Sequence, residues 1–179
     1  MSRIGYIGFA PLQPVDSLLS GCVADLRARG LRVAGVMQVL PEESTAYEGA
    51  LNFRDVEDGA IIRFSQDLGE GAEGCSLDPQ ALAEVAQKIG GALERKPQLV
   101  VINRFGKAEA DGHGLRSVVE QALLADIPLL VAVRDDFRPA WDAFHGGMAE
   151  CLPRDKDAVL EWCDTVTLGR GSAPEHLVE

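Results

Sequence analysis

The chain has 179 residues, of which 46% are hydrophobic and 25% are charged, and its formal net charge at pH 7 is −11. This length and composition suit one domain with a sizeable core and argue against a disordered chain. The negative charge argues against general binding to DNA or to an anionic membrane surface, because it repels phosphate groups.

The first half of the chain alternates apolar strands with an amphipathic helix. The predicted elements are strands at residues 4–9, 31–39 and 60–65 and a helix at 15–29. Gly30 is expected to end this helix as a left-handed C-cap. Residues 40–58 are polar and are predicted to form a loop or an excursion, and 40–65 is the one segment that suggests a subdomain.

The second half continues the alternation. The predicted elements are helices at 78–94, 115–125, 137–145 and 155–166, and strands at 99–103, 127–133 and 149–152, the last at a sheet edge. Such alternation indicates right-handed βαβ units, so we expect an α/β fold: a three-layer open, mainly parallel sheet with helices on both faces. We expect this single domain over 1–170 and a C-terminal tail over 171–179.

The positions of the cysteines and of the apolar residues indicate the cellular compartment. The four cysteines form no CxxC pair, and no His/Cys cluster has zinc spacing. We see no signal peptide and no apolar run of about 18 residues. We therefore expect a cytoplasmic protein with free thiols, no membrane span and no metal site.

In an open parallel sheet, ligands bind beyond the carboxyl ends of the strands. After the first strand, Gly8 lies where a P-loop protein begins the sequence G-x-x-x-x-G-K-[ST], but the second glycine and the lysine are absent. Pro11 and Pro14 remove backbone N–H donors that cradle phosphates. An ordinary connection and a weakened anion site are equally open here.

The glycine-rich stretch after residue 65 leads into a predicted helix and favours an anion-binding nest of backbone N–H groups. The residues expected to contribute are Gly69, Gly71, Ala72, Gly74 and Cys75. Its acidic residues Asp67, Glu70 and Glu73 oppose an anion unless they point outward. A plain surface loop is the alternative.

After the strand at 99–103, Asn103 stands where a P-loop ATPase often carries an acidic magnesium-binding residue. Arg104 and Lys107 follow, and we expect these three residues to contribute to ligand binding. The alternative is solvated loop charge. His113 lies between two glycines and is expected to be exposed.

Several cations lie within or just after the predicted strand ends and are expected to gather positive charge at one edge: Arg63, Arg104, Lys107, Arg134 and Arg138. Ion pairs with Asp67, Asp135 or Asp136 are the alternative. The rings of Trp141 and Phe144 favour core packing over ligand stacking. No nucleophile–base pair is evident, so no catalytic residue or cofactor is assigned.

Three stretches resemble signature segments of the bacterial domain-of-unknown-function 2478 family: SQDLGEGAEGCSLD, VVINRFGKAEADGHGLR and IPLLVAVRDDFRPAWDAFHGG. The resemblance covers nearly the whole chain. Members are often encoded beside molybdate ABC transporters, which implies a link to molybdenum handling. The family is similar to P-loop nucleoside-triphosphatases, including the molybdopterin-guanine dinucleotide biosynthesis adaptors, which the segment LRARGLRVAGVMQ resembles.

Three functions follow as hypotheses. The first is binding of an oxyanion such as molybdate, or of a phosphate-bearing ligand, accessory to molybdenum uptake or cofactor metabolism. The second is a divergent nucleotide hydrolase or transferase, which the missing lysine and Asn103 count against. The third is a regulatory partner of molybdate transport or molybdoenzyme maturation proteins, with Trp141 and Phe144 at the contact. Homodimer formation is left open.

Overall fold

The computed structural model describes residues 2–11, 13, 15–39, 52–63 and 79–168. The strands are β1 (Ile4–Phe9), β2 (Val33–Gln38), β3 (Asn52–Asp55), β4 (Ile61–Arg63), β5 (Leu99–Phe105), β6 (Leu129–Arg134) and β7 (Ala149–Cys151). The helices are α1 (Val15–Ala28), α2 (Pro79–Glu94), α3 (Lys107–Ala110), α4 (Arg116–Leu124), α5 (Arg138–His145) and α6 (Lys156–Thr167), with a 3₁₀ turn, η2 (Asp135–Phe137), before α5.

All seven strands form one sheet in the order β4-β3-β2-β5-β6-β1-β7. The pairs β2–β5, β5–β6, β6–β1 and β1–β7 are parallel, which confirms the predicted mainly parallel sheet. The hairpin of β3 and β4 adds to one edge in antiparallel fashion. Of the two alternatives predicted for residues 40–58, a loop or an excursion, the loop is wrong at β3, where the buried side chain of Phe53 belongs to the main core.

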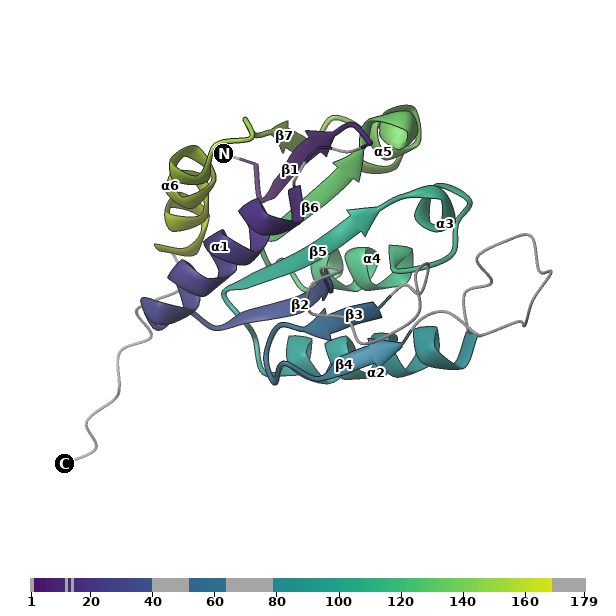
Figure 1. Ribbon diagram of the computed structural model, residues 1–179, viewed down its shortest axis with the longest axis horizontal. Coiled ribbons are helices and arrows are strands. Elements are labelled where there is room, and N and C mark those ends of the chain that lie inside the picture. Colours follow the sequence, from purple (N-terminus) through teal and green to yellow (C-terminus); the bar gives the residue numbers. More distant parts are fainter. Residues whose placement is uncertain (1, 12, 14, 40–51, 64–78, 169–179) are drawn as a thin grey trace.

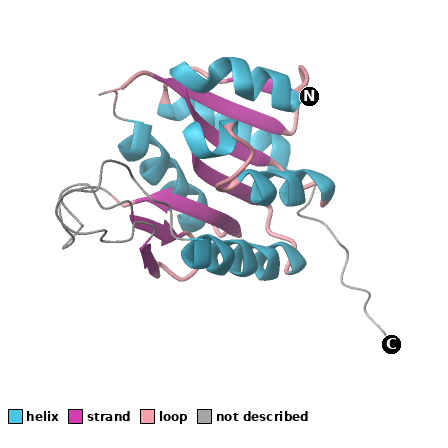
Figure 2. Ribbon diagram, turned by 90° about the vertical axis from the view of Figure 1, so that its right-hand side faces the viewer, coloured by secondary structure: helices cyan, strands magenta, loops and turns pink. Residues whose placement is uncertain are grey.

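Helices cover both faces of the sheet, as Figures 1 and 2 show. One face is covered by α2, α4 and α5, whose apolar side chains form one core cluster with the sheet. The other face is covered by α1 and α6, which share a second cluster. This three-layer arrangement is the predicted one, and it follows from right-handed crossovers that leave β1 and β2 in opposite directions along the sheet.

The helix ends follow their local sequence. Gly30 has a φ of 85°, and Leu31 N–H donates to the carbonyl of Leu26 (3.1 Å), as predicted for a glycine-ended helix. Asp155 is the N-cap of α6, its carboxylate accepting from Ala158 N–H (2.9 Å). Among the described helices, none has the length and apolarity needed to cross a membrane.

The carboxyl ends of the parallel strands define one edge of the sheet. Strands β1 and β5 both end there, with β6 between them. Strand β4 is antiparallel to β3, which is antiparallel to β2, so β4 points to the same edge. The loops predicted to carry the site therefore begin at a common edge, although residues 64–78 lie outside the described part of the chain.

Candidate functional site

The connection from β1 to α1 is held by its own hydrogen bonds. Ala10 N–H donates to the side-chain oxygen of Gln13 (2.9 Å), and Gln13 N–H donates back to the carbonyl of Ala10 (3.1 Å). Val15 N–H donates to the carbonyl of Gln13 (2.9 Å). These donors are already occupied and Pro11 has none, so this connection differs from a phosphate-cradling P-loop.

Beyond this connection, α1 carries a carboxylate that meets the end of β5. The amide nitrogen Nδ2 of Asn103 donates to Asp16 Oδ1 (2.5 Å). Arg104 Nη2 lies 3.2 Å from Asp16 Oδ1 and 3.3 Å from Oδ2. Asn103 is fully buried, whereas the side chains of Arg104 and Asp16 are 27% and 22% exposed. This contact joins the first loop region to the strand end predicted to bind a ligand.

A register shift in β5 explains how two adjacent side chains reach one carboxylate. Side chains of successive residues in a regular strand point to opposite faces. The pairing of β5 with β6 shifts between Asn103 and Phe105, which takes Arg104 out of the regular ladder. Such bulges re-aim side chains and often lie beside functional sites. Arg104 also stacks over the Phe9 ring, 4.9 Å from its centroid.

The same contact contains two unsatisfied polar atoms. Asn103 Oδ1 and Arg104 Nε are buried and have no hydrogen-bond partner within the described ranges. An unmet buried polar atom costs roughly 1–3 kcal/mol, so such atoms are infrequent in folded proteins. The site therefore holds one spare acceptor and one spare donor beside Asp16.

Lys107, the third predicted residue of this loop, lies apart on α3. Its side chain is 77% exposed, and Nζ lies 2.6 Å from Asp111 Oδ2, one helical turn further on. Its neighbour Glu109 is buried and accepts from the N–H groups of Gly106 and Leu115 (both 2.9 Å), so it braces the loop. His113 is exposed, as predicted.

The expected excess of positive charge is wrong for the cations whose side chains are described. Arg104 pairs with Asp16 and Lys107 with Asp111, as above. Arg134 lies 2.7 Å from Asp136, and Arg138 lies 3.2 Å from Asp142. Each cation is matched by a nearby carboxylate because the helices and turns that follow the strands at this edge also carry acidic residues. Any anion bound here must therefore compete with the protein's own carboxylates.

The rings of α5 belong mainly to the core. Trp141 is fully buried and packs edge-on against Tyr6 and Phe105, which confirms core packing over ligand stacking. Phe144 is half-buried beneath the Arg116 guanidinium. The predicted contact surface is therefore wrong for Trp141, which offers no exposed area, whereas Phe144 remains a prediction because it is only half-buried.

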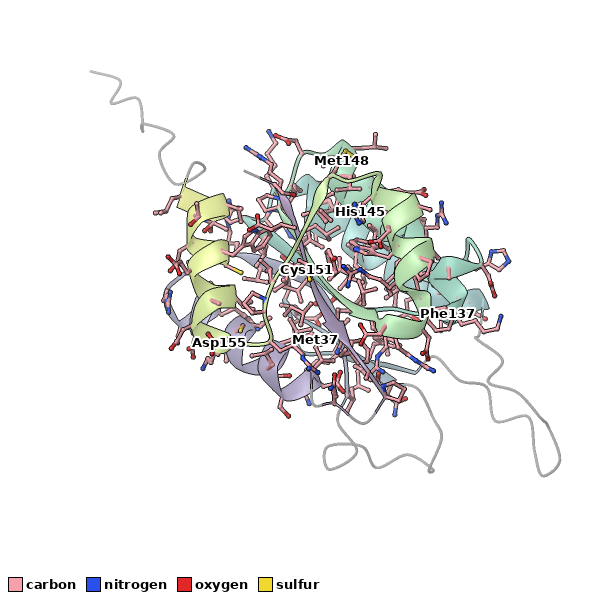
Figure 3. All side chains as sticks on the ribbon, turned by 90° about the horizontal axis from the view of Figure 1, so that it is seen from above. Met37, Phe137, His145, Met148, Cys151 and Asp155 are labelled. Atoms are coloured by element: carbon pink, nitrogen blue, oxygen red, sulfur yellow. The ribbon has the colours of Figure 1, made fainter. Side chains whose placement is uncertain are left out.

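The region beside α5 holds polar groups that serve the fold. In Figure 3, Phe137 and His145 mark the two ends of α5, and Cys151 lies on the neighbouring strand β7. His145 Nδ1 accepts from the N–H groups of Gly147 and Ala149. Burial, with a hydrogen bond to Cys151, raises the pKa of Tyr6 to about 12, so its phenol stays neutral at physiological pH.

The remaining predicted site residues, Gly69, Gly71, Ala72, Gly74 and Cys75, lie outside the described part of the chain. Within that part, no group of three or more His, Cys, Asp and Glu side chains is arranged to hold a metal ion. Asp16 is a site residue that the sequence pattern did not predict. A carboxylate in the first turn after the first strand was the signal for it, because such a residue lies at the carboxyl edge.

The sheet order, the two helical layers and the junction of the first loop with β5 define an α/β fold like that of P-loop nucleoside-triphosphatases. The crystal structure of THEP1 from the hyperthermophile Aquifex aeolicus has this fold, with a TM-score of 0.62 and 15% sequence identity. The similarity covers 92% of this chain and 98% of THEP1.

The chain belongs to the family described as protein of unknown function (DUF2478), whose model matches residues 4–162. It is also 32% identical over 161 residues to a protein of Bradyrhizobium diazoefficiens named molybdenum import ATP-binding protein ModC 2. This match covers 90% of the chain but 18% of that relative, so the chain spans less than a fifth of its length.

Proposed function

We propose that this chain binds a phosphate-bearing ligand or a small oxyanion at the junction of the β1–α1 connection with the end of β5. The observation that carries the proposal is the convergence of Asn103 and Arg104 on the first turn of α1. An arginine and a helix N-terminus both favour an anionic group. The P-loop-like fold supports testing nucleotides as candidate ligands.

The role in molybdenum uptake or cofactor metabolism is also part of the proposal. Its support is the relative named as a molybdenum import ATP-binding protein, of which a segment matches this chain. Molybdate is therefore a ligand to test, and molybdate transport or molybdoenzyme maturation proteins are candidate partners. A regulatory role without catalysis is compatible with this context.

The glycine-rich stretch from Gly69 to Cys75 is proposed as a further source of N–H donors, because β4 points to the same edge. We expect Lys107 to contribute less to ligand binding than Arg104, since its side chain is exposed and paired with Asp111. Cytoplasmic localisation and a single domain over residues 1–170 are proposed on the sequence pattern.

A nucleotide hydrolase or transferase is the second candidate, and the fold is what favours it. The lysine that stabilises phosphoryl transfer is absent, and donors of the first connection are occupied by Gln13 and Ala10. We therefore place binding first. Phosphate release from ATP and GTP with magnesium distinguishes the two candidates.

Titration calorimetry and thermal-shift measurements test the binding proposal. The probes are molybdate, tungstate, sulfate, phosphate and the magnesium complexes of ATP and GTP. Replacing Arg104 by Gln should weaken binding by about tenfold or more, because it removes a charge-assisted hydrogen bond. Arg29→Gln is the matched control: Arg29 lies at the other end of α1 and pairs with the half-exposed Asp164. Absence of heat and of thermal shift with all probes would overturn the proposal.

A further inference from the structure

The carboxylate of Asp16 lies where a bound anion would be most stable. It is in the first turn of the 14-residue helix α1, where the helix dipole favours negative charge. It receives hydrogen bonds from Asn103 Nδ2 and from Arg104 Nη2. Helix end, amide and guanidinium are the groups that the proposed function assigns to a ligand. The protein thus supplies its own anion to its candidate site.

Asp16 leaves part of this site unsatisfied. Asn103 has no exposed surface, and its amide lies against Asp16, yet its Oδ1 has no partner among the described residues. The same is true of Arg104 Nε. A contact that only fastened α1 to β5 has no need of a spare donor and a spare acceptor. An anion that reaches Arg104 Nε would satisfy this donor, whereas Asn103 Oδ1 accepts and needs a donor such as a hydroxyl group of the ligand.

The pair is also open to exchange. Asp16 and Arg104 each keep about a quarter of their side-chain surface in solvent. An ion pair with this exposure is weak, because water competes for both partners. An incoming anion can therefore take the place of Asp16 beside Arg104 without entering a sealed core.

We infer that Asp16 is an internal competitor for the ligand site: an anion binds by displacing the Asp16 carboxylate from Arg104, and Asp16 thereby lowers the affinity. This inference rests on the proposed function and concerns the regulation of that site. The competition restricts binding to anions whose charge or number of oxygens outmatches a single carboxylate. Pyrophosphate and nucleoside triphosphates meet this condition better than monovalent anions.

The test measures binding of pyrophosphate, molybdate and magnesium–ATP by titration calorimetry. Asp16→Asn keeps the side-chain shape and removes its charge. We expect it to bind the tightest wild-type probe about tenfold more strongly or better, because the anion no longer competes with a carboxylate for Arg104. Asp16→Ser removes the same charge with a residue that suits a helix start, in case the first variant fails to fold.

Asp25→Asn is the matched control. Asp25 lies on the same helix and pairs with Lys156 (2.9 Å), so this variant changes the net charge equally without touching the site. Its affinity should stay within about twofold of the wild type, because a distant exposed charge is largely screened. The double variant Asp16→Asn/Arg104→Gln should bind the probe no more tightly than Arg104→Gln alone, since the gain in affinity acts through Arg104.

The outcomes separate this inference from the proposed function. If the wild type binds a probe and both Asp16 variants bind it equally or more weakly, the competitor role is overturned while the binding function stands. The competitor role is also overturned if the double variant binds the probe more tightly than Arg104→Gln alone. An equal gain in affinity for Asp25→Asn overturns it as well. If neither the wild type nor any variant binds a probe, the proposed function fails, and the inference with it.

Discussion

Asp16 and Arg104 are 88 positions apart in the sequence, yet Asp16 Oδ1 lies 3.2 Å from Arg104 Nη2. The contact connects the start of α1 to the end of β5, two strands away from β1 in the sheet. It thus ties together the exits of two strands whose loops form the candidate site. The pair is partly exposed, so its strength decides how readily it opens.

A double-mutant cycle measures that strength without any ligand. Asp16→Asn and Arg104→Gln, alone and together, should give a coupling free energy of about 1 kcal/mol in urea unfolding, as for a partly exposed pair with direct hydrogen bonds. The more exposed Arg29–Asp164 pair serves as comparison and should give less than about 0.5 kcal/mol. Zero coupling at the first pair would mean that Arg104 does not hold Asp16 in solution.

Asn103→Asp should make folding stability depend on pH. The variant places a second carboxyl group against Asp16 in a fully buried position. Because the new carboxylate is buried and repels that of Asp16, the folded variant retains a proton that the unfolded chain releases near pH 4 (about the ordinary value). Stability is then full below that pH and falls as pH rises, by roughly 2–4 kcal/mol at neutrality.

Urea unfolding between pH 4 and 8 (roughly the range where the two forms differ) checks this prediction. Asn103→Leu is the control: it also loses the hydrogen bond to Asp16 but introduces no charge, so its loss of stability should not vary with pH in this way. A flat profile for Asn103→Asp would show that Arg104 compensates both carboxylates.

The sheet could be predicted from the sequence because buried parallel strands are apolar almost throughout. The runs at β5 and β6 are such strands, and they were placed within two residues of their observed bounds. Strand β3 was missed because its four residues, Asn52–Asp55, are polar at three positions. Its one apolar side chain, Phe53, carries no periodicity that a sequence pattern can reveal.

The site was predictable only in part. Asn103 and Arg104 follow a clear strand, so the rule that ligands bind at carboxyl ends identified them. Their common partner, Asp16, was not predicted. The order of the strands in the sheet decides which loops meet, and the sequence pattern does not reveal that order. The ion pairs of Lys107 and Arg138 use carboxylates four positions away in helices that begin beside the strand ends. The helix at Lys107–Ala110 was predicted as a loop, whereas the helix at Arg138–His145 was predicted within one residue, although its ion pair was not.

Gly35→Ala should destabilise the protein strongly. A Cβ atom on Gly35 would lie 1.9 Å from the carbonyl oxygen of Val101, its partner across β2 and β5. The φ of Gly35 is 126°, which non-glycine residues rarely adopt. Backbone must move in the centre of the sheet, so we expect a loss of more than about 3 kcal/mol in urea unfolding.

Gly59→Ala separates steric overlap from backbone strain. Gly59 also has a positive φ, 74°, but no atom of the described residues lies within 4 Å of the added Cβ. This variant should cost only about 1 kcal/mol, the ordinary cost of a left-handed alanine. Equal losses at the two positions would contradict the close approach of β2 and β5.

The protein should lose stability in alkali through Cys22 and Cys163, the two buried thiols among the described residues. Burial raises the pKa of Cys163 to about 12 and that of Cys22 to about 11, and both lie in the core between α1, α6 and the sheet. In the unfolded chain, thiols lose their protons near about pH 8.5. Above that pH the folded state holds protons that the unfolded state has released, so stability is full below it and falls as pH rises towards the folded pKa values.

Each thiol should cost roughly 2 kcal/mol of folding stability by about pH 10.5. Urea unfolding from pH 7.5 to 10.5 measures the fall, which Cys163→Ala should reduce by roughly 2 kcal/mol, the contribution of that thiol. Thr165→Ala, an exposed change on the same helix, should retain it in full. An unchanged slope in Cys163→Ala would mean that this thiol already ionises freely in the folded protein.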